Sequence, residues 1–352
     1  MRKTAVAFAV ATTLAGPAAW AAGYTITTID FPGASVTLVE SLNDAGRVGG
    51  FYKLASGKSA GFTERDGTFT SIGDSLPCRP NGRCGTAVTA VNERGQMAGV
   101  FVADIDFPGA FIQSISSSEP LIVEPPDYPN TTVSLAGLNN RGVLAGFYSN
   151  AESAGQIFEL IDGNFKTISL PVPDVLVAYA SGLNDWGQLT GVYETSTAAH
   201  GFILTGTKLT ILDLPADWGA DASGPRRIND FGVVIGNYEI PSESFITNHA
   251  FAFADGVFRK IDFPGAAQTD VFELNNRGEI FGVYSLTPMG GVNDSHPFLL
   301  KDGEYSDLSA LFPGTFAIQG LNNRGQLFGW YTDANCTLNC VTHGFVATPT
   351  EE

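Results

Sequence analysis

The four histidines are the residues of this chain whose type and spacing most directly suggest chemistry, because imidazole is a common ligand of zinc. They lie 49, 47 and 47 residues apart, at His200, His249, His296 and His343. This spacing places each histidine at one position of a repeat. Each histidine opens the third strand of its repeat, and with strands about 4.8 Å apart that strand lies roughly 16 Å from the axis around which the repeats are arranged. Equivalent histidines of adjacent repeats should therefore be more than about 10 Å apart. Zinc holds its ligand nitrogens at about 2.1 Å. We therefore expect no shared metal ion and no cofactor, and predict that each histidine bonds to the next loop or sheet. A separate metal site at each histidine, completed by a loop carboxylate, is the alternative.

The four cysteines form two close pairs, Cys78 with Cys84 and Cys336 with Cys340. Neither pair has the Cys-x-x-Cys spacing of redox-active thiols. In an exported chain such pairs predict two local disulfides, which stabilise little because the loops that they close are short. A zinc site formed by all four cysteines is the alternative, and oxidation of the thiols competes with it. Because every histidine occupies the same repeat position, a Ser-His-Asp triad has no natural candidate, and we assign no catalytic residue.

These residues are set in a repeat that extends over most of the chain. Seven times, a large apolar residue and Asn are followed by two variable residues, Gly, and an alternating segment that ends in Gly-x-Tyr or Gly-x-Phe. The repeat asparagines are 49, 47, 45, 45, 46 and 47 residues apart, at Asn43, Asn92, Asn139, Asn184, Asn229, Asn275 and Asn322. A period of about 40 to 50 residues indicates a propeller or a solenoid.

The repeat also predicts its own strands and turns. Asn at the first turn position and Gly at the fourth favour a type I turn followed by a left-handed residue, which joins two strands as a hairpin. The strand after the turn is apolar on both faces, which indicates that both faces are covered. Its central glycine indicates a closely approaching backbone or ring. A second hairpin follows, turning at sequences such as Asp66-Gly67. Four short antiparallel strands per repeat predict an all-β fold, a seven-bladed β-propeller of four-stranded blades.

The strand expected near the N-terminus should complete the last blade. Residues 29–34 are identical in sequence to residues 261–266, which end the fourth strand of another repeat. The last repeat has three strands of its own, so we expect the segment 24–34 to supply its fourth and remove an exposed sheet edge. Asp30 and Asp262 are then repeat equivalents, and we predict a turn role for them instead of catalysis.

Short motifs link the chain to a known repeat family. His249-Ala250-Phe251 has variants at residues 200–202, 296–298 and 343–345, and Phe-Pro-Gly-Ala occurs at 31–34 and 263–266. On these motifs and the Asn-x-x-Gly phrase, the chain resembles the HAF-repeat family of extracellular repeat proteins over about residues 24–348. The resemblance implies an exported bacterial protein and lends no catalytic residue. The first three repeats depart from the pattern, with Ala60, Gly109 or Ala110, and Gln156 near the place of the histidine.

The first 21 residues read as a secretory signal peptide. A basic start at Arg2 and Lys3 precedes a short apolar segment and the Ala19-Trp20-Ala21 cleavage pattern. We expect residues 22–352 to be a single secreted or periplasmic domain, a monomer that does not insert into a membrane. Loss of the two basic residues changes the formal charge from −17 to −19. Such an acidic surface disfavours nucleic acid and anionic lipid as partners.

The loops suggest where a ligand could bind. Both hairpins of a blade turn on one face, with short and uniform turns, whereas the opposite face receives loops of variable length. Because function commonly lies on variable loops held by a rigid scaffold, we predict that Trp218, Arg226 and Arg227 bind an extracellular glycan or protein. Two alternatives remain open: a hydrolase or lyase acting on polysaccharide through carboxylates or a loop-bound metal, and an envelope scaffold without a ligand site.

Overall fold

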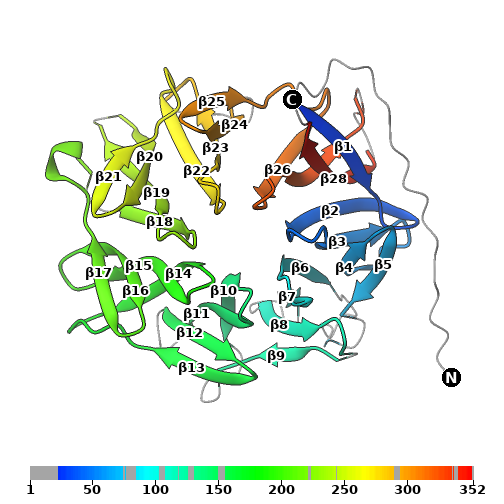
Figure 1. Ribbon diagram of the computed structural model, residues 1–352, viewed down its shortest axis with the longest axis horizontal. Coiled ribbons are helices and arrows are strands. Elements are labelled where there is room, and N and C mark those ends of the chain that lie inside the picture. Colours follow the sequence, from blue (N-terminus) through cyan, green and yellow to red (C-terminus); the bar gives the residue numbers. More distant parts are fainter. Residues whose placement is uncertain are drawn as a thin grey trace. The chain divides into compact units, whose positions relative to one another are not determined.

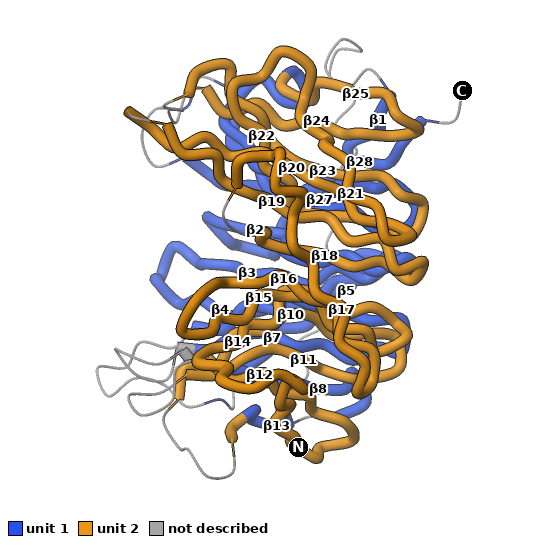
Figure 2. The backbone as a smooth tube through the Cα atoms, turned by 90° about the vertical axis from the view of Figure 1, so that its left-hand side faces the viewer, with its two compact units in different colours: residues 1–123, 310–352 blue, residues 124–309 orange. Residues whose placement is uncertain are grey.

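The repeats form strands, and the described part of the chain contains one short 3-10 helix besides them (Figure 1). In this computed structural model the described residues are 23–350, without 74–75, 77–84, 103–107, 118, 126–130, 150–154, 221–222, 243, 289–293, 335 and 337–339. The predicted signal peptide, Cys78 and Cys84 lie outside the described residues. Among these residues no helix has the length and apolar character needed to span a bilayer. The chain divides into two compact units, unit 1 with residues 1–123 and 310–352 and unit 2 with residues 124–309 (Figure 2).

Unit 1 holds three groups of four strands, each paired antiparallel. The first group is β2 (Ala34–Leu42), β3 (Val48–Leu54), β4 (Ser59–Arg65) and β5 (Thr68–Ile72). The second is β6 (Thr86–Val91), β7 (Gln96–Val102), β8 (Pro108–Ser114) and β9 (Leu121–Val123). The third is β26 (Phe316–Leu321), β27 (Leu327–Thr332), β28 (Thr342–Pro349) and β1 (Tyr24–Ile29). One parallel bridge between Val36 and Thr342 joins the first and third groups.

Unit 2 holds four separate four-stranded antiparallel sheets. They are β10 (Thr132–Leu138), β11 (Val143–Ser149), β12 (Gln156–Ile161) and β13 (Asn164–Ile168); β14 (Val177–Leu183), β15 (Gln188–Glu194), β16 (Ala199–Thr205) and β17 (Lys208–Leu212); β18 (Ser223–Ile228), β19 (Val234–Pro241), β20 (Ile246–Ala254) and β21 (Val257–Lys260); and β22 (Gln268–Leu274), β23 (Ile280–Ser285), β24 (His296–Lys301) and β25 (Glu304–Asp307). The 3-10 helix, Ala216–Trp218, lies between β17 and β18. The predicted all-β class and four-stranded antiparallel sheets are confirmed.

The repeat asparagine closes its own turn and also links neighbouring sheets. Oδ1 of Asn184 accepts hydrogen bonds from the backbone N–H groups of Trp186 at 3.1 Å and Gln188 at 2.9 Å. The turn ends at Gly187, whose φ of 77° is the left-handed conformation that favours glycine. Nδ2 of Asn184 donates to the carbonyl oxygen of Asn229 in the next sheet at 2.9 Å. The same link between sheets runs from Asn139 to Asn184 and from Asn229 to Asn275 in unit 2, and from Asn322 to Asn43 and from Asn43 to Asn92 in unit 1. The sequence predicted the turn but not this link.

One phenylalanine from the third strand of each sheet forms the centre of its core. All seven are fully buried: Phe62, Phe111, Phe158, Phe202, Phe251, Phe298 and Phe345. Each is paired with the glycine in the second strand of its sheet, as Phe62 is with Gly50. A Cβ atom on Gly50 would overlap the carbonyl oxygen of Leu38, so the close approach predicted from the sequence is confirmed.

The first strand of every sheet carries a β-bulge three residues before the repeat asparagine. At this position the antiparallel register skips one residue, which has no partner on the second strand. A bulge leaves its extra residue unpaired and changes the direction of its side chain. We name these residues the bulge row: Glu40, Thr89, Ala136, Ser181, Arg226, Phe272 and Gln319. Their chemistry differs from repeat to repeat although the backbone geometry is constant.

The N-terminal strand completes the last group, as predicted. β1 pairs antiparallel with β28 over six residues, from Tyr24 opposite Pro349 to Ile29 opposite Gly344. The hydroxyl groups of Thr28 and Tyr331 lie 2.9 Å apart and add a side-chain hydrogen bond across this group. The edge of β28 is therefore covered by a strand from the other end of the sequence.

Candidate ligand-binding groove

Unit 2 contains a groove of about 580 Å³ beside the β18–β21 sheet. Its walls come from β18, β19 and β20, from Asp270 on the first strand of the next sheet, and from Ser181 on β14. Pro241 and Ile246, which pair at the end of the β19–β20 hairpin, also line it. This hairpin end is opposite to the Asn-x-x-Gly turn of the same sheet, so the groove lies on the side of the variable loops.

Three polar side chains form a cluster on the groove wall. The carboxylate of Asp270 accepts hydrogen bonds from Nδ2 of Asn237 at 3.1 Å and from Nδ2 of Asn248, which lies 3.2 Å from each carboxylate oxygen. Oδ1 of Asn237 accepts from the backbone N–H of Val271 at 2.9 Å. All three side chains are half-buried. The cluster links two sheets and presents amide and carboxylate groups to the groove.

This cluster occupies positions that are apolar or uncharged in the other repeats. Asn237 stands between the glycine and tyrosine of its second strand, where the other six repeats have Phe51, Val100, Phe147, Val192, Val283 and Trp330. Asp270 stands five residues before its repeat asparagine, where the others have Leu38, Ala87, Ser134, Tyr179, Gly224 and Ala317. At the equivalent pair in unit 2, the rings of Phe147 and Tyr179 pack edge to face with centroids 4.9 Å apart. A packing contact between sheets has thus become a hydrogen-bonded polar cluster at this one place.

A glycine accounts for part of the open space. Gly224 occupies the repeat position that Tyr179 and Asp270 hold in the neighbouring sheets. A Cβ atom on Gly224 would have a single neighbour within 4 Å, the carbonyl oxygen of Asn237 at 3.1 Å. Where a side chain would fill the space between sheets, the glycine leaves the groove open.

Arg226 is the predicted site residue that lines the groove. It belongs to the bulge row and is exposed. Its guanidinium carbon lies 5.2 Å from the ring centroid of Phe272, the bulge residue of the next sheet, which is within the range of a cation–π interaction. Among the described residues, no carboxylate lies within 4.0 Å of its guanidinium nitrogens.

Arg227 connects three neighbouring first strands instead of lining the groove. Its Nε lies 3.0 Å from both carboxylate oxygens of Glu273 on β22, and its Nη2 forms an ion pair with the same group. Its Nη1 donates to the carbonyl oxygens of Ser181 on β14 at 3.0 Å and of Arg226 at 3.1 Å. The nearby Glu273 carboxylate raises the pKa of Arg227 above its ordinary value. Arg227 therefore holds the backbone of Arg226 in place through the hydrogen bond from its Nη1.

Trp218 packs against the core of its own sheet. Its ring centroid lies 5.2 Å from that of Tyr238 and 6.2 Å from that of Phe258, and the ammonium group of Lys260 lies 5.0 Å above it. It is half-buried and is not among the residues that line the groove. On the other side, Tyr238 stacks on His249 with ring centroids 5.4 Å apart. Of the three predicted ligand-binding residues, the structure thus places only Arg226 at the groove.

The histidines hold the end of the fourth strand in their own group. Nδ1 of His200 lies 2.8 Å from Asp213, Nδ1 of His249 lies 3.1 Å from Asp262, and Nδ1 of His343 lies 2.9 Å from Asp30. Each aspartate follows a fourth strand. His296 differs, since its Nδ1 lies 3.2 Å from the hydroxyl of Ser309. All four rings stack on the tyrosine of the second strand. Asp30 and Asp262 thus bind a histidine, beyond the turn role predicted for them.

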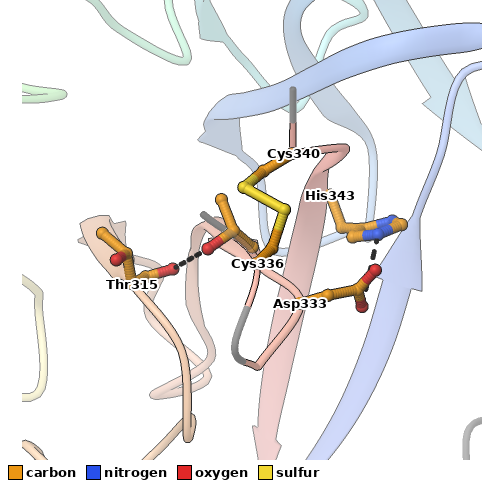
Figure 3. The surroundings of a disulfide bond; sticks show 6 residues. Thr315, Asp333, Cys336, Cys340 and His343 are labelled. Atoms are coloured by element: carbon orange, nitrogen blue, oxygen red, sulfur yellow. Dashed lines mark hydrogen bonds and ion pairs between the residues drawn. A yellow bond between two sulfur atoms is a disulfide. The ribbon is translucent and has the colours of Figure 1, made fainter. Parts of the chain in front are cut away.

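The described residues contain no group of three or more His, Cys, Asp or Glu side chains that could hold a metal ion. Cys336 and Cys340 form a disulfide across the loop between β27 and β28 in unit 1. Figure 3 shows this disulfide beside Asp333, whose carboxylate lies 3.8 Å from Nε2 of His343. The predicted pairing of these two cysteines is confirmed.

One segment matches a hydrolase motif in sequence but does not have the structure that the motif requires. Residues 57–61 read Gly-Lys-Ser-Ala-Gly, the Gly-x-Ser-x-Gly pattern of a nucleophile elbow. The elbow requires a strand, a sharp turn and a helix, whereas Ser59 begins β4 just after the hairpin turn from β3. The segment is a hairpin, and we assign it no nucleophile.

Comparisons with known proteins identify the fold. No family model matches the chain, and no curated protein matches its sequence. An oligogalacturonate lyase from Vibrio parahaemolyticus is similar in structure, with a TM-score of 0.58 and 8% identity over 93% of this chain and 94% of the lyase. The protein YCF48, solved bound to a D1 peptide, gives a TM-score of 0.52 and 11% identity over 94% of this chain and 96% of that protein. The β-propeller domain of the Trilobed protease from Pyrococcus furiosus is a further match, with a TM-score of 0.38 and 14% identity over 80% and 99% of the two chains. At these identities the likeness concerns the fold, which is that of propeller proteins.

The sequence carried a signal for the groove residues that the prediction did not use. Asn237 and Asp270 are polar exceptions at two otherwise apolar or uncharged repeat positions. A comparison of the seven copies at each position would have singled out both residues. Asn248 has no such signal, because the segment before the third strand varies in length between repeats.

Proposed function

We propose that this protein is an exported binding module, a β-propeller of seven four-stranded blades that binds an extracellular glycan in the groove of unit 2. The observation that carries the proposal is the polar cluster of Asn237, Asn248 and Asp270, which replaces apolar packing between two sheets at the groove. Half-buried polar groups in place of apolar contacts between sheets seldom add stability. Their presence beside an open groove therefore favours a role in recognition.

The chemistry of the groove suits a hydroxyl-rich ligand. The amide groups of Asn237 and Asn248 donate and accept hydrogen bonds, and the carboxylate of Asp270 accepts them. Sugar hydroxyls also donate and accept, so they can bind to both kinds of group. Pro225, Pro241 and Ile246 add apolar surface to the same groove, against which the C–H face of a sugar ring can pack. A site of this kind combines apolar lining with a few convergent polar groups.

Export and the repeat family belong to the same proposal. The N-terminal segment has the pattern of a signal peptide, and the Cys336–Cys340 disulfide fits an oxidising compartment outside the cytoplasm. We propose a secreted or periplasmic monomer of the HAF-repeat type. The seven repeats of the sequence and the four-stranded groups support the count of seven blades.

The test uses residues that the repeat itself supplies. Asn237→Val combined with Asp270→Ala introduces side chains found at these positions in other repeats, so the fold should persist. The mature protein and this double variant would be applied to an array of soluble polysaccharides, and binding would be quantified by isothermal titration calorimetry. We expect the variant to lose at least about tenfold in affinity, the scale of one lost hydrogen bond to the ligand, with an unchanged or higher Tm.

The matched control is Phe231→Arg. Phe231 is 78% exposed on an Asn-x-x-Gly turn, and four other repeats carry arginine at this position. This variant should bind as the wild type does. Equal binding by the groove variant and the wild type would refute the groove as the site, and binding of a protein without any polysaccharide would refute the glycan.

A further inference from the structure

We propose that Arg226 makes the groove selective for carboxylated glycans, that is, for polysaccharides that contain uronic acid. The inference rests on the proposed function, since it names the class of glycan bound at the same groove. It depends on the environment of Arg226 and on the contrast between this residue and Arg227.

Arg226 is a cation that has no carboxylate partner within the described part of the chain. It is the one basic residue on the groove wall, and no acidic side chain among the described residues lies within 4.0 Å of its guanidinium nitrogens. The adjacent Arg227 is bound to Glu273 through both Nε and Nη2. In a chain with a formal charge of −17, an exposed arginine that remains unpaired at a groove is available for an anion from outside.

The surrounding structure fixes where Arg226 projects. The β-bulge between Pro225 and Arg227 releases it from the strand register. Its carbonyl oxygen accepts a hydrogen bond from Nη1 of Arg227, which holds the backbone. Its guanidinium lies against the ring of Phe272 at 5.2 Å, which limits the number of conformations that the side chain adopts. An arginine that is positioned before binding loses less conformational entropy when it forms a bidentate pair with a carboxylate.

The two chemistries of the groove together select the ligand class. The carboxylates of Asp270 and Glu239, which both line the groove, repel a simple anion. Asp270 already accepts hydrogen bonds from two amide side chains, however, and both carboxylates can accept others from hydroxyl groups. A uronic acid carries hydroxyl groups on the ring and one carboxylate beside it. Its hydroxyls match the Asn237, Asn248 and Asp270 cluster, and its carboxylate matches Arg226. A neutral sugar would use only the first of these contacts.

The experiment compares polygalacturonate with the same polymer after full methyl esterification, which removes the charge and keeps the ring. Affinity electrophoresis and calorimetry would measure both ligands on the wild type, Arg226→Gln and Arg226→Lys. We expect the wild type to bind the acid form about 10- to 100-fold more tightly, the scale of a charge-assisted hydrogen bond, with an affinity that falls as salt rises. Arg226→Gln should lose this preference and its salt dependence. Arg226→Lys should retain part of it, because an ammonium group has charge but no planar fork.

The possible results separate the inference from the function on which it rests. Equal binding of the two polymers by the wild type, or an unchanged preference in Arg226→Gln, would overturn the inference and leave glycan binding intact. Binding of an acidic peptide such as polyglutamate in place of both polymers would overturn the inference and the glycan proposal together. Because Arg226 is exposed, the Tm of its variants should equal that of the wild type. Arg227→Gln should lower the Tm, since it removes contacts to three strands.

Discussion

Replacing Asn184 with aspartate should destabilise the protein by breaking the link between two sheets. Asn184 is 4% exposed. Its Nδ2 donates to the carbonyl oxygen of Asn229 at 2.9 Å and to Oε1 of Gln188 at 2.7 Å. Aspartate keeps an oxygen that can close the turn but has no N–H to donate. The carbonyl oxygen of Asn229 then loses a hydrogen bond, and a carboxylate oxygen faces it.

The magnitude follows from two contributions. A buried polar group left without a partner costs about 1–3 kcal/mol, and burying a carboxylate without a countercharge adds to this. We expect the free energy of unfolding at pH 7 to fall by about 3–5 kcal/mol. Burial raises the pKa of an introduced carboxyl above its unfolded value of about 3.9. The loss should therefore be smaller at pH 4, where the protonated acid can donate a hydrogen bond, and should grow as the pH rises.

Urea denaturation followed by tryptophan fluorescence at pH 4 and pH 7 measures this effect. Asn164→Asp is the matched control, because it makes the same chemical change at an exposed position on β13. It should change the stability by less than about 0.5 kcal/mol. An equal loss in the two variants at pH 7 would refute the role of Asn184 as a link between sheets.

Three further predictions concern unit 1. The hydrogen bond that His343 donates to the Asp30 carboxylate raises the pKa of His343. The wild type should therefore lose stability as the pH rises from about 6.5 through the folded-state pKa, and His343→Gln should lose this pH dependence in calorimetry. Deleting Tyr24–Ile29 uncovers the edge of β28 and should lower the Tm and cause aggregation in size-exclusion chromatography; an unchanged elution profile and Tm would contradict this. Replacing Cys336 and Cys340 with serine should reduce stability by at most about 2 kcal/mol, because the closed loop is short; dithiothreitol should reduce the stability of the wild type by at least as much, since it also reduces the predicted Cys78–Cys84 disulfide.

The local features of the fold could be predicted because short-range interactions produce them. The Asn-x-x-Gly turn depends on four consecutive residues, and the left-handed conformation of Gly187 follows from its type. The pairing of the first two strands could be predicted because residues repeat at alternate positions after each turn, which is typical of a strand. The hydrogen bond from Asn184 to Asn229 could not be read in this way, because it joins residues 45 positions apart that meet only when sheets stack.

Of the candidate site, the sequence predicted Arg226 but misplaced Arg227 and Trp218, because their contacts are with residues far away in the sequence. Arg226 and Arg227 are adjacent and of the same type, but the carboxylate that binds Arg227 is Glu273, which is 46 residues away. Nothing in the local sequence tells which arginine is paired. Trp218 was predicted to contact ligand because it is an aromatic residue in a variable loop. In the structure its ring instead packs against Tyr238 and Phe258, which belong to later strands.

The bulge row gives this fold a place where residues can change without disturbing the strands. A bulge residue takes no part in the pairing of the first two strands, so Glu40, Arg226 and Phe272 occupy one geometry with unrelated chemistry. Each repeat thus carries one position at which a single substitution alters the surface and leaves the hydrogen bonds of the sheet intact. A repeat protein with this property can acquire a new ligand by point substitution on a constant backbone. For protein engineering, the same positions offer up to seven sites at which to install binding groups.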